Sequence, residues 1–416
     1  MRLAICDYSG HPFQVELSRC LASRGHPTLH LHFAEFQTPK GALTRLPNDP
    51  QNFQVEGVRL GRPFDKGKFF RRRFLEAEIG RRIAGRAADF RADVVIGCNM
   101  PLDAQQKLRS SCARRGVAFI FWLQDIYSKA IDHYLRARFG LLGHAIGSYY
   151  THLEADLLRN SDAVIAISEK FVAPLARWGV ESRRIRVIPN WAPLSEIYPV
   201  AKNNEWARRH GLDDKCVALY SGTLGLKHDP ALLLEAAQAG RGRGVHVAVI
   251  SEGAGVDWLA RKKHELGVDN LVLLPFQPME RYPEVLGAGD ILLAMVGEEA
   301  AAFSVPSKIL SYLAAGKPIV ASIAGDNDAA TTIRDAGAGL VVRPSDRRSF
   351  ADRILDLAAD PLLRATLGQN ARAFAESRFD VERIADRFED VLQGLFLAAD
   401  RPALLSRWRG AAATHR

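Results

Sequence analysis

The chain has 416 residues, of which 47% are hydrophobic and 25% charged, and its formal net charge is +9. This composition is typical of a globular protein, and the length indicates two domains. No apolar run reaches the roughly 18 residues of a membrane span, so no membrane-spanning helix is expected. The positive charge favours an anionic partner without saying which one.

The start of the chain and its cysteines indicate a cytoplasmic protein. Residues 1–7 predict a first strand and carry no apolar signal-peptide core. The five cysteines are scattered without metal-binding spacing, at Cys6, Cys20, Cys98, Cys112 and Cys216. We therefore expect reduced packing residues and no zinc site.

Strands and helices alternate through the first half of the chain. Strands are predicted at residues 3–6, 29–33, 94–97, 118–123, 163–167 and 186–188. A helix at 13–23 follows the first strand across a short loop that contains Gly10, which is how a parallel sheet begins. One glycine is not a dinucleotide-binding fingerprint, because the pattern G-x-G-x-x-G is absent.

The second half repeats this alternation after a proline-punctuated passage at residues 189–204, which we interpret as an interdomain linker. Strands are predicted at 216–220, 245–250, 271–274, 291–295, 319–321 and 340–342, with helices at 230–239 and 349–359. A last helix at 379–398 is amphipathic, so one of its faces must be buried. The pattern predicts two doubly wound halves of nearly equal size.

Residues 303–322 carry the most informative local pattern. A loop leads into Ser307 and Lys308, a helix follows, and Gly316 ends it before the strand at 319–321. The free N–H groups at the start of this helix, beside a hydroxyl and an ammonium, suit an anion, most naturally a diphosphate. The alternative is an ordinary loop–helix–strand unit of an α/β protein.

Other strand ends in the second half add to this prediction. The glycine loop at 221–225 lets a backbone approach a phosphate closely, Lys227 adds a positive charge, and Phe276 is placed to border a base or sugar. Each of these residues alone is better explained as a turn or a solvated side chain. Because ligands bind at the carboxyl ends of parallel strands, the set together favours a nucleotide-diphosphate site.

Basic residues concentrate in segments 66–91 and 134–150, where they alternate with aromatic and aliphatic residues. This pattern suits helices that lie on an anionic membrane surface. The alternative is a solvated helix whose apolar face packs on its own domain, and Glu76 and Glu78 dilute the charge of the first segment. Nucleic acid is a third possible partner of these segments. We do not expect the chain to bind nucleic acid, because the sequence contains no nucleic-acid-binding motif.

The motifs of this chain, in their order and spacing, resemble those of retaining glycosyltransferases of the GT-B fold, family 4 type. The chain is most similar to the bacterial exopolysaccharide and O-antigen branch, which includes colanic-acid-like glycosyltransferases. The resemblance covers nearly the whole chain. It rests on residues 9–11, 24–26, 121–127, 161–168, 187–190, 220–225, 306–308 and 313–322.

The resemblance implies an α/β fold with two Rossmann-like domains that face a cleft. Residues 1–190 would bind the acceptor, residues 205–378 would bind the nucleotide sugar, and residues 379–400 would form a crossover helix that completes the N-terminal domain. The implied reaction moves a hexose from a nucleotide-diphosphate sugar to a lipid-linked glycan, with retention, in cell-surface polysaccharide biosynthesis. The implied location is peripheral, on the inner face of the cytoplasmic membrane.

Carried onto this sequence, the resemblance implies donor-binding roles for Gly222, Thr223, Lys227, Phe276, Ser307, Lys308 and Ser311. Asp125 and His11 are candidates for orienting or deprotonating the acceptor hydroxyl, and Ser9 and Gly10 form an acceptor or phosphate loop. The alternatives are a helix N-cap for Asp125 and a loop-packing residue for His11. No D-x-D pair lies in a suitable loop, so we expect neither a metal nor a cofactor beyond the donor.

The sequence departs from the family pattern at three places. Phe303 and Ser311 occupy the positions of a glutamate pair, Thr223 replaces an arginine after the loop glycine, and Gln124 replaces the histidine of a His-Asp pair. These changes leave Lys227 and Lys308 to carry the charge of the donor site. Two other function classes stay open, namely a non-catalytic nucleotide- or glycan-binding assembly protein and a sugar-nucleotide 2-epimerase.

Overall fold

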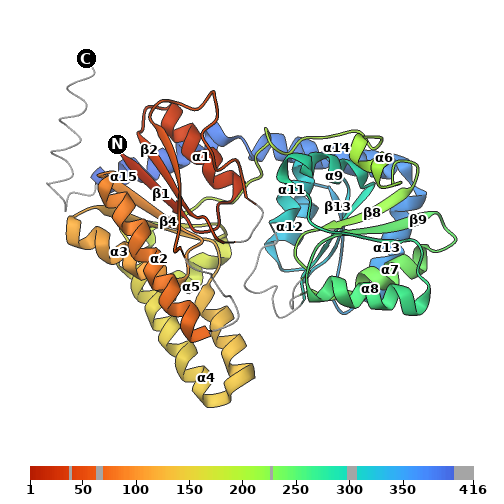
Figure 1. Ribbon diagram of the computed structural model, residues 1–416, viewed down its shortest axis with the longest axis horizontal. Helices are drawn as coiled ribbons and strands as arrows, with labels where there is room; N and C mark the ends of the chain where they lie inside the picture. Colours follow the sequence, from red (N-terminus) through yellow and green to blue (C-terminus); the bar gives the residue numbers. More distant parts are fainter. Residues whose placement is uncertain (37–39, 62–68, 225–227, 298–306, 398–416) are drawn as a thin grey trace. The chain divides into compact units, whose positions relative to one another are not determined.

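The computed structural model describes residues 1–36, 40–61, 69–224, 228–297 and 307–397, which fold into two compact units (Figure 1). The first unit comprises Met1–Pro189 and Val381–Arg416, and the second comprises Asn190–Asp380. Each unit has its own parallel sheet, with helices packed on it, and its own buried core. The predicted fold class, α/β with two Rossmann-like halves, is confirmed.

Seven parallel strands form the sheet of the first unit in the order β3-β2-β1-β4-β5-β6-β7. Their bounds are β1 Leu3–Asp7, β2 Thr28–Phe33, β3 Phe53–Val58, β4 Val94–Cys98, β5 Ala118–Leu123, β6 Ala163–Ala166 and β7 Ile185–Val187. Most are continuous buried runs, as expected for a parallel sheet covered on both faces. The edge strand β3 was not predicted, because only its two end residues are buried and it shows no apolar run.

The helices of the first unit pack in two groups. The helices α1 (Pro12–Ser23) and α15 (Val381–Leu397) pack against each other. The helices α2 (Phe69–Asp89), α3 (Leu102–Arg115) and α4 (Tyr127–Arg159) pack in sequence, α2 on α3 and α3 on α4. The short helix α5 (Val172–Arg177) and two 3₁₀ turns, at Glu169–Phe171 and Ser182–Arg184, lead to the last strands.

The helix α4 is a hairpin of two arms rather than one straight rod (Figure 1). The chain reverses at Gly140, whose φ of 55° and ψ of −127° lie outside the helical region. Two further glycines let the arms approach closely. A Cβ at Gly143 would lie 2.0 Å from the Leu135 carbonyl oxygen, and one at Gly147 would lie 2.2 Å from Asp132 Oδ1.

Six parallel strands form the sheet of the second unit in the order β10-β9-β8-β11-β12-β13. Their bounds are β8 Cys216–Ser221, β9 Val245–Ile250, β10 Leu271–Leu274, β11 Ile291–Met295, β12 Ile319–Ser322 and β13 Gly339–Val342. The helices are α6 Glu205–Arg209, α7 Ala231–Gly240, α8 Ala254–Leu266, α9 Tyr282–Ala288, α11 Lys308–Ala314, α12 Asp328–Asp335, α13 Arg347–Ala359 and α14 Pro361–Arg378, with a 3₁₀ turn at Met279–Arg281. Every predicted strand of this half is present.

The helix α15 buries the apolar face that its sequence pattern predicts. Ile384, Ala385, Phe388 and Leu392 are buried, and the ring of Phe388 meets that of Trp122 in β5 edge-to-face, with centroids 4.8 Å apart. The helix therefore completes the core of the first unit, although more than two hundred residues separate it from β5.

Arg24, which follows α1, joins that helix to α15 through three carboxylates. Its guanidinium lies 2.7 Å from Glu382, 2.7 Å from Asp386 and 2.8 Å from Glu389. His26 adds a contact to Glu389 at 3.0 Å. Charge-assisted bonds to one guanidinium form a network, although each exposed pair by itself is weak.

Arg24→Met should lower the free energy of unfolding by about 1–2 kcal/mol, since three ion pairs of roughly 0.2–1 kcal/mol each are lost. The loss should shrink in 1 M salt, because screening weakens partly exposed pairs. Urea unfolding measures both effects. Arg183→Met removes one exposed pair with Glu181 and is the matched control; equal losses in the two variants would show that Arg24 does not hold α15.

Candidate active site

Gly222 and Lys308, two predicted donor residues, are brought together in the second unit. A Cβ added at Gly222 would lie 3.1 Å from Lys308 Nζ, and the Gly222 φ of +134° is one that L-residues rarely adopt. Glycine is therefore favoured at this position on two grounds. The absence of a side chain leaves the backbone of the β8 loop open beside an ammonium group.

The Lys308 ammonium lies over the ring of Tyr220, 3.7 Å from its centroid. Such a cation–π contact orients a flexible lysine side chain. The Tyr220 hydroxyl donates in turn to the Thr223 carbonyl oxygen at 2.8 Å, and burial raises the pKa of this tyrosine. One aromatic residue thus links the end of β8, the loop after it and the first residue of α11.

Tyr312, which the sequence analysis did not single out, anchors α11 to the sheet. Its buried hydroxyl accepts the Ser221 N–H at 3.3 Å and donates to the Leu293 carbonyl oxygen at 3.1 Å. Tyr312 lies one helical turn after Lys308, so both side chains are on one face of α11. This contact fixes Lys308 relative to the carboxyl end of β8.

The structure does not bring the other predicted donor residues together in the same way. Ser307 and Thr223 are exposed, and Phe276 is 37% exposed after β10, where its N–H donates to Glu252 Oε1 at 3.3 Å. The Ser311 hydroxyl hydrogen-bonds the Tyr282 side chain, so it is already engaged. Lys227 lies outside the described residues, as does Phe303.

Ser251, at the carboxyl end of β9, is a polar residue that the sequence analysis missed. Its hydroxyl is buried and has no hydrogen-bond partner within the described ranges of the chain. The strand β9 neighbours β8, so Ser251 lies at the same edge of the sheet as the Gly222 loop. In the sequence, Ser251 is marked only by its position after a predicted strand, a position like that of Ser221 at the end of β8.

In the first unit the loop after β1 is organised by Asp7, another residue that the sequence analysis missed. Its buried carboxylate accepts the Ser9 N–H at 3.1 Å and the His11 N–H at 2.5 Å. With its amide oriented to satisfy both groups, Gln14 donates to both oxygens of Asp7. Burial raises the pKa of Asp7, while His11 and the two N–H groups act in the opposite direction.

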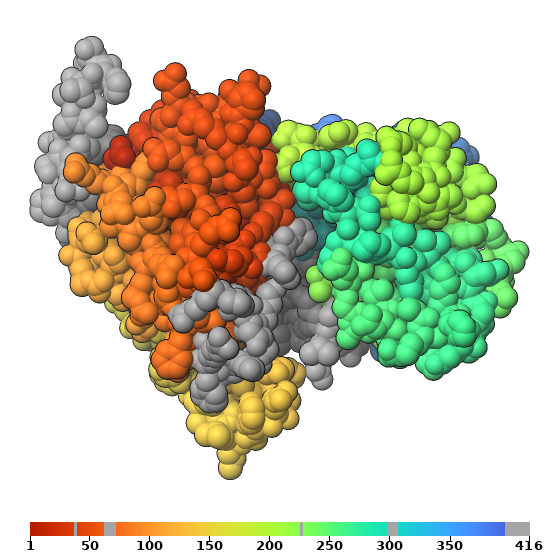
Figure 2. All heavy atoms as spheres, in the orientation of Figure 1, coloured from red at the N-terminus to blue at the C-terminus, as the bar shows by residue number. Residues whose placement is uncertain are grey.

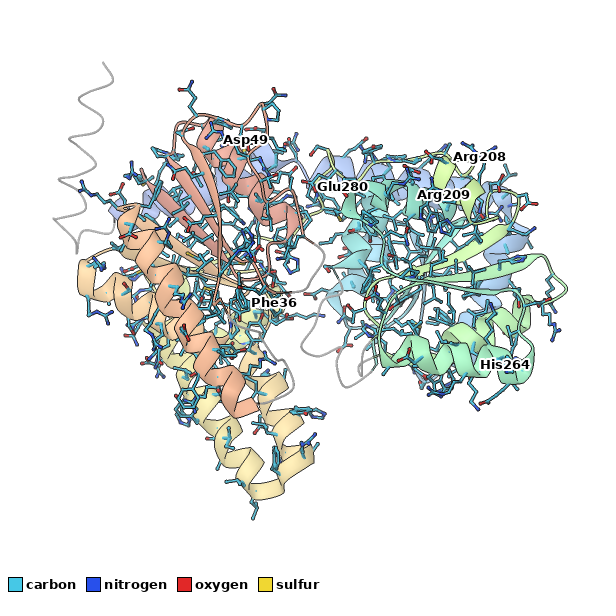
Figure 3. All side chains as sticks on the ribbon, viewed as in Figure 1. Phe36, Asp49, Arg208, Arg209, His264 and Glu280 are labelled. Carbon is cyan, nitrogen blue, oxygen red and sulfur yellow. The ribbon has the colours of Figure 1, made fainter. Side chains whose placement is uncertain are left out.

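This arrangement places the predicted residues Ser9, Gly10 and His11 on one rigid turn. Gly10 has a φ of +78°, and a Cβ there would lie 2.5 Å from Leu43 Cδ1, so only glycine fits without a shift. The neighbouring Tyr8 packs its buried ring against Phe33 and Phe36; Figure 3 labels Phe36 in this unit. His11 is part-exposed, with its ring stacked on Phe13 at 6.0 Å.

Asp125 lies at the end of β5, two strands from β1 in the same sheet. The strand β4 lies between β1 and β5. Because all three strands are parallel, the loops that follow β1 and β5 lie at the same edge of the sheet. The alternative interpretation of Asp125 as the N-cap of the following helix is wrong, because the N-cap residue is Ile126. The first N–H groups of that helix are instead bound by Glu154, which the sequence analysis did not identify.

The basic residues of α2 are largely neutralised within the first unit. Glu76 accepts Arg72 Nε at 2.6 Å, and Asp103 accepts Arg73 Nε at 3.1 Å. Arg82 and Arg86 likewise pair with acidic side chains, Glu78 and Glu56. These four arginines are therefore paired within the unit.

The tip of the α4 hairpin is different in character. Leu141 is 90% exposed and Leu142 66% exposed, and Phe139 and Tyr134 are about half-exposed beside them. Figure 2 shows this part of α4, coloured yellow, projecting to the surface of its unit. Arg138 lies against the ring of Phe139, so positive charge adjoins the apolar tip.

The described ranges hold no helix with the length and hydropathy that a membrane span requires. Within those same ranges, His, Cys, Asp and Glu side chains form no group of three or more suited to a metal ion. The five cysteines are free thiols.

Two family models match this chain, one in each half. The "Glycosyl transferase 4-like domain" matches residues 11–191 and "Glycosyl transferases group 1" matches residues 202–374. A putative colanic acid biosynthesis glycosyl transferase, WcaI of Escherichia coli, is 25% identical over 313 residues, which is 73% of this chain and 75% of that protein. The chain spans about half the length of several other curated relatives.

Solved structures share the fold at low sequence identity. Anabaena HepE, solved with UDP and glucose, is 19% identical with a TM-score of 0.68, over 94% of this chain and 99% of that one. WaaG, a glycosyltransferase involved in lipopolysaccharide biosynthesis, is 17% identical with a TM-score of 0.65, over the same fractions. At these identities the likeness concerns the fold.

Gly222→Ala and Lys308→Met should be coupled, because the alanine Cβ displaces the ammonium that the second change removes. We expect a coupling free energy of at least about 0.5 kcal/mol in a double-mutant cycle of urea unfolding. Gly242→Ala combined with Lys308→Met is the matched control, since Gly242 has a φ of +72° and nothing within 4 Å of an added Cβ. Additive effects in both pairs would contradict the contact.

Proposed function

Because this chain belongs to the group 1 glycosyltransferases of the GT-B fold, with a glycosyl transferase 4-like N-terminal domain, we propose that it moves a hexose from a nucleotide-diphosphate sugar to a glycan acceptor. We further propose that the transfer proceeds with retention and serves the synthesis of a surface polysaccharide. The similarity to the putative colanic acid biosynthesis glycosyl transferase of Escherichia coli supports this last assignment.

The observation that carries the proposal is the placement of Lys308 beside Gly222. An ammonium held over Tyr220 and a side-chain-free backbone at the end of β8 together suit a diphosphate. Phe276, part-exposed at the end of β10, suits the base or the sugar. Anabaena HepE, which shares the fold, was solved with UDP and glucose, and this supports a nucleotide-sugar donor.

In the proposed reaction the diphosphate departs from the anomeric carbon while Lys308 offsets the negative charge that develops on it. Lys227, which the structure does not describe, is proposed to add a second positive charge. The acceptor hydroxyl attacks on the face that the diphosphate leaves, so the anomeric configuration is retained. Asp125 and His11, from two loops at one edge of the first unit's sheet, are proposed to orient or deprotonate that hydroxyl.

Lys308→Ala should lower the transfer rate at least about tenfold, since a charge-assisted phosphate contact is worth roughly 1.5–3 kcal/mol. Transfer from radiolabelled nucleotide sugar to acceptor measures the loss. Lys262→Ala is the control, because Lys262 lies on α8 and pairs with Glu265. Unchanged transfer in Lys308→Ala would remove this lysine from the site, and donor binding without turnover in the wild type would favour a non-catalytic assembly protein.

We propose that no divalent metal takes part, because Lys308, with the proposed second charge of Lys227, would take the role that a metal has beside the diphosphate. Transfer should therefore persist in EDTA at the rate measured without chelator. The test is a rate comparison with and without chelator, followed by added magnesium or manganese. Complete loss of transfer that only these ions restore would refute the metal-free assignment.

The acceptor is proposed to be carried on a lipid, so the enzyme would work at an anionic membrane surface. The exposed leucines at the tip of the α4 hairpin, next to Arg138 and Arg136, are suited to enter such a surface. Arg72 and Arg73 are less suited, because both are engaged within the unit.

Leu141→Ser with Leu142→Ser should weaken binding to phosphatidylglycerol vesicles at least about tenfold, because burying one leucine is worth about 1.5–3 kcal/mol. Vesicle sedimentation measures the change. The control replaces Leu362 and Leu363 with serine, since these leucines are exposed on α14 of the other unit. If the wild type does not bind these vesicles, or if the control weakens binding equally, the hairpin is not the membrane contact.

A further inference from the structure

The first turn of α4 is held by a side chain from the far arm of the same hairpin. The N-cap residue Ile126 offers no side-chain acceptor. The Glu154 carboxylate accepts the Tyr127 N–H at 3.0 Å with one oxygen and the Ser128 N–H at 2.9 Å with the other. This contact closes the hairpin at its base, immediately after Asp125.

An ordinary helix start does not need this arrangement. A serine or asparagine at the N-cap would satisfy the same N–H groups without burying a charge. Glu154 is completely buried and comes from the returning arm, so the geometry of the β5 loop depends on the hairpin being closed. Burying a carboxylate costs free energy, and this carboxylate binds the chain directly after Asp125, a proposed acceptor-side residue. We therefore look for a role of Glu154 beyond stability.

Other ionisable groups surround the base of the hairpin. They are Asp125 from the β5 loop, Tyr127 from the outgoing arm, Cys98 at the end of β4, Asp7 at the end of β1, and Asp103 from α3, which accepts a hydrogen bond from Tyr150 on the returning arm. Asp125, Asp7 and Asp103 are carboxyl groups, so ionised Glu154 adds negative charge to an acidic surrounding.

Burial raises the pKa of Glu154 to about 7, and Asp125 contributes in the same direction, while the bonds from Tyr127 and Ser128 act against it. Glu154 therefore changes its charge near neutral pH.

We infer that Glu154 is a positioning residue for sugar transfer: its ionised carboxylate fixes the first turn of α4 and thereby the Asp125 side chain. This inference rests on the proposed function, since it takes Asp125 to be an acceptor-side group. Protonated Glu154 accepts N–H bonds more weakly, so the β5 loop loosens and Asp125 is no longer held in place. Donor binding in the second unit does not depend on this contact.

The direction of the pH effects follows from the raised pKa. Transfer should fall as the pH drops through about 7, because Glu154 becomes neutral. The contribution of Glu154 to the free energy of unfolding should instead increase as the pH drops. A folded-state pKa above the ordinary value of a glutamate means that this group's contribution to stability is full below the unfolded pKa and is lost as the pH rises through the folded one.

The experiment compares wild type, Glu154→Gln and Glu154→Ala, with Glu78→Gln on α2 as the control. Transfer is measured from pH 5.5 to 9, separating kcat from the KM for the nucleotide sugar, and thermal unfolding is recorded at the same pH values. We expect Glu154→Gln to lower kcat about 10- to 100-fold at pH 8, as a misplaced group does. The KM should change less than about twofold, because the donor loops are intact.

The wild type should show an acidic limb near pH 7 that Glu154→Gln lacks, and Glu154→Ala should lose more activity than Glu154→Gln. The melting temperature of Glu154→Gln relative to wild type should rise between pH 5 and 8, which reports the ionisation without any activity. A Glu154→Gln variant with the kcat and pH profile of the wild type would overturn the inference. If the wild type transfers no sugar at any pH, the proposed function fails first and the inference fails with it.

Discussion

Both units depend on one constraint of parallel sheets: all strands end at the same edge, and the loops there carry backbone N–H groups that no neighbouring strand binds. Buried polar side chains satisfy these groups. Asp7 binds the loop after β1, Glu154 binds the chain after β5, and Tyr312 binds the end of β8. Each is itself enclosed, so the loops are held rigidly at the edge where the candidate residues lie.

The net charge of +9 is not spread evenly over groups that could bind a ligand, because many of the arginines form ion pairs within the protein. Arginines that alternate with aromatic residues in α2 bind acidic neighbours, and Arg24 holds the last helix of the first unit. The positive charges that are suited to bind an anionic ligand lie instead at a few separate places. Lys308 is one of them, and the tip of the α4 hairpin, where arginines adjoin exposed leucines, is another.

The sequence was sufficient to predict the alternation of strands and helices, the amphipathic face of α15, the position of Gly222 directly after β8 and that of Lys308 at the start of α11, because each has a periodic or local signal. It did not reveal the partners that fix those residues. Glu154 is a glutamate in a helix and resembles a solvated charge, while Tyr312 resembles a core residue. Their contacts join residues far apart in the chain, and no local pattern marks them. The reversal at Gly140 was missed for a related reason, since both arms continue a helical pattern.

We propose that the second unit binds a nucleoside diphosphate through the loop of Gly222 and the ammonium of Lys308. The most direct measurement is the thermal unfolding of the wild-type chain with UDP, GDP, dTDP or ADP. One of them should raise the melting temperature, because a ligand at 100 times its dissociation constant adds about 2.7 kcal/mol to the stability of the unit that it binds. A melting temperature that none of the four nucleotides changes, even at millimolar concentration, would contradict the claim.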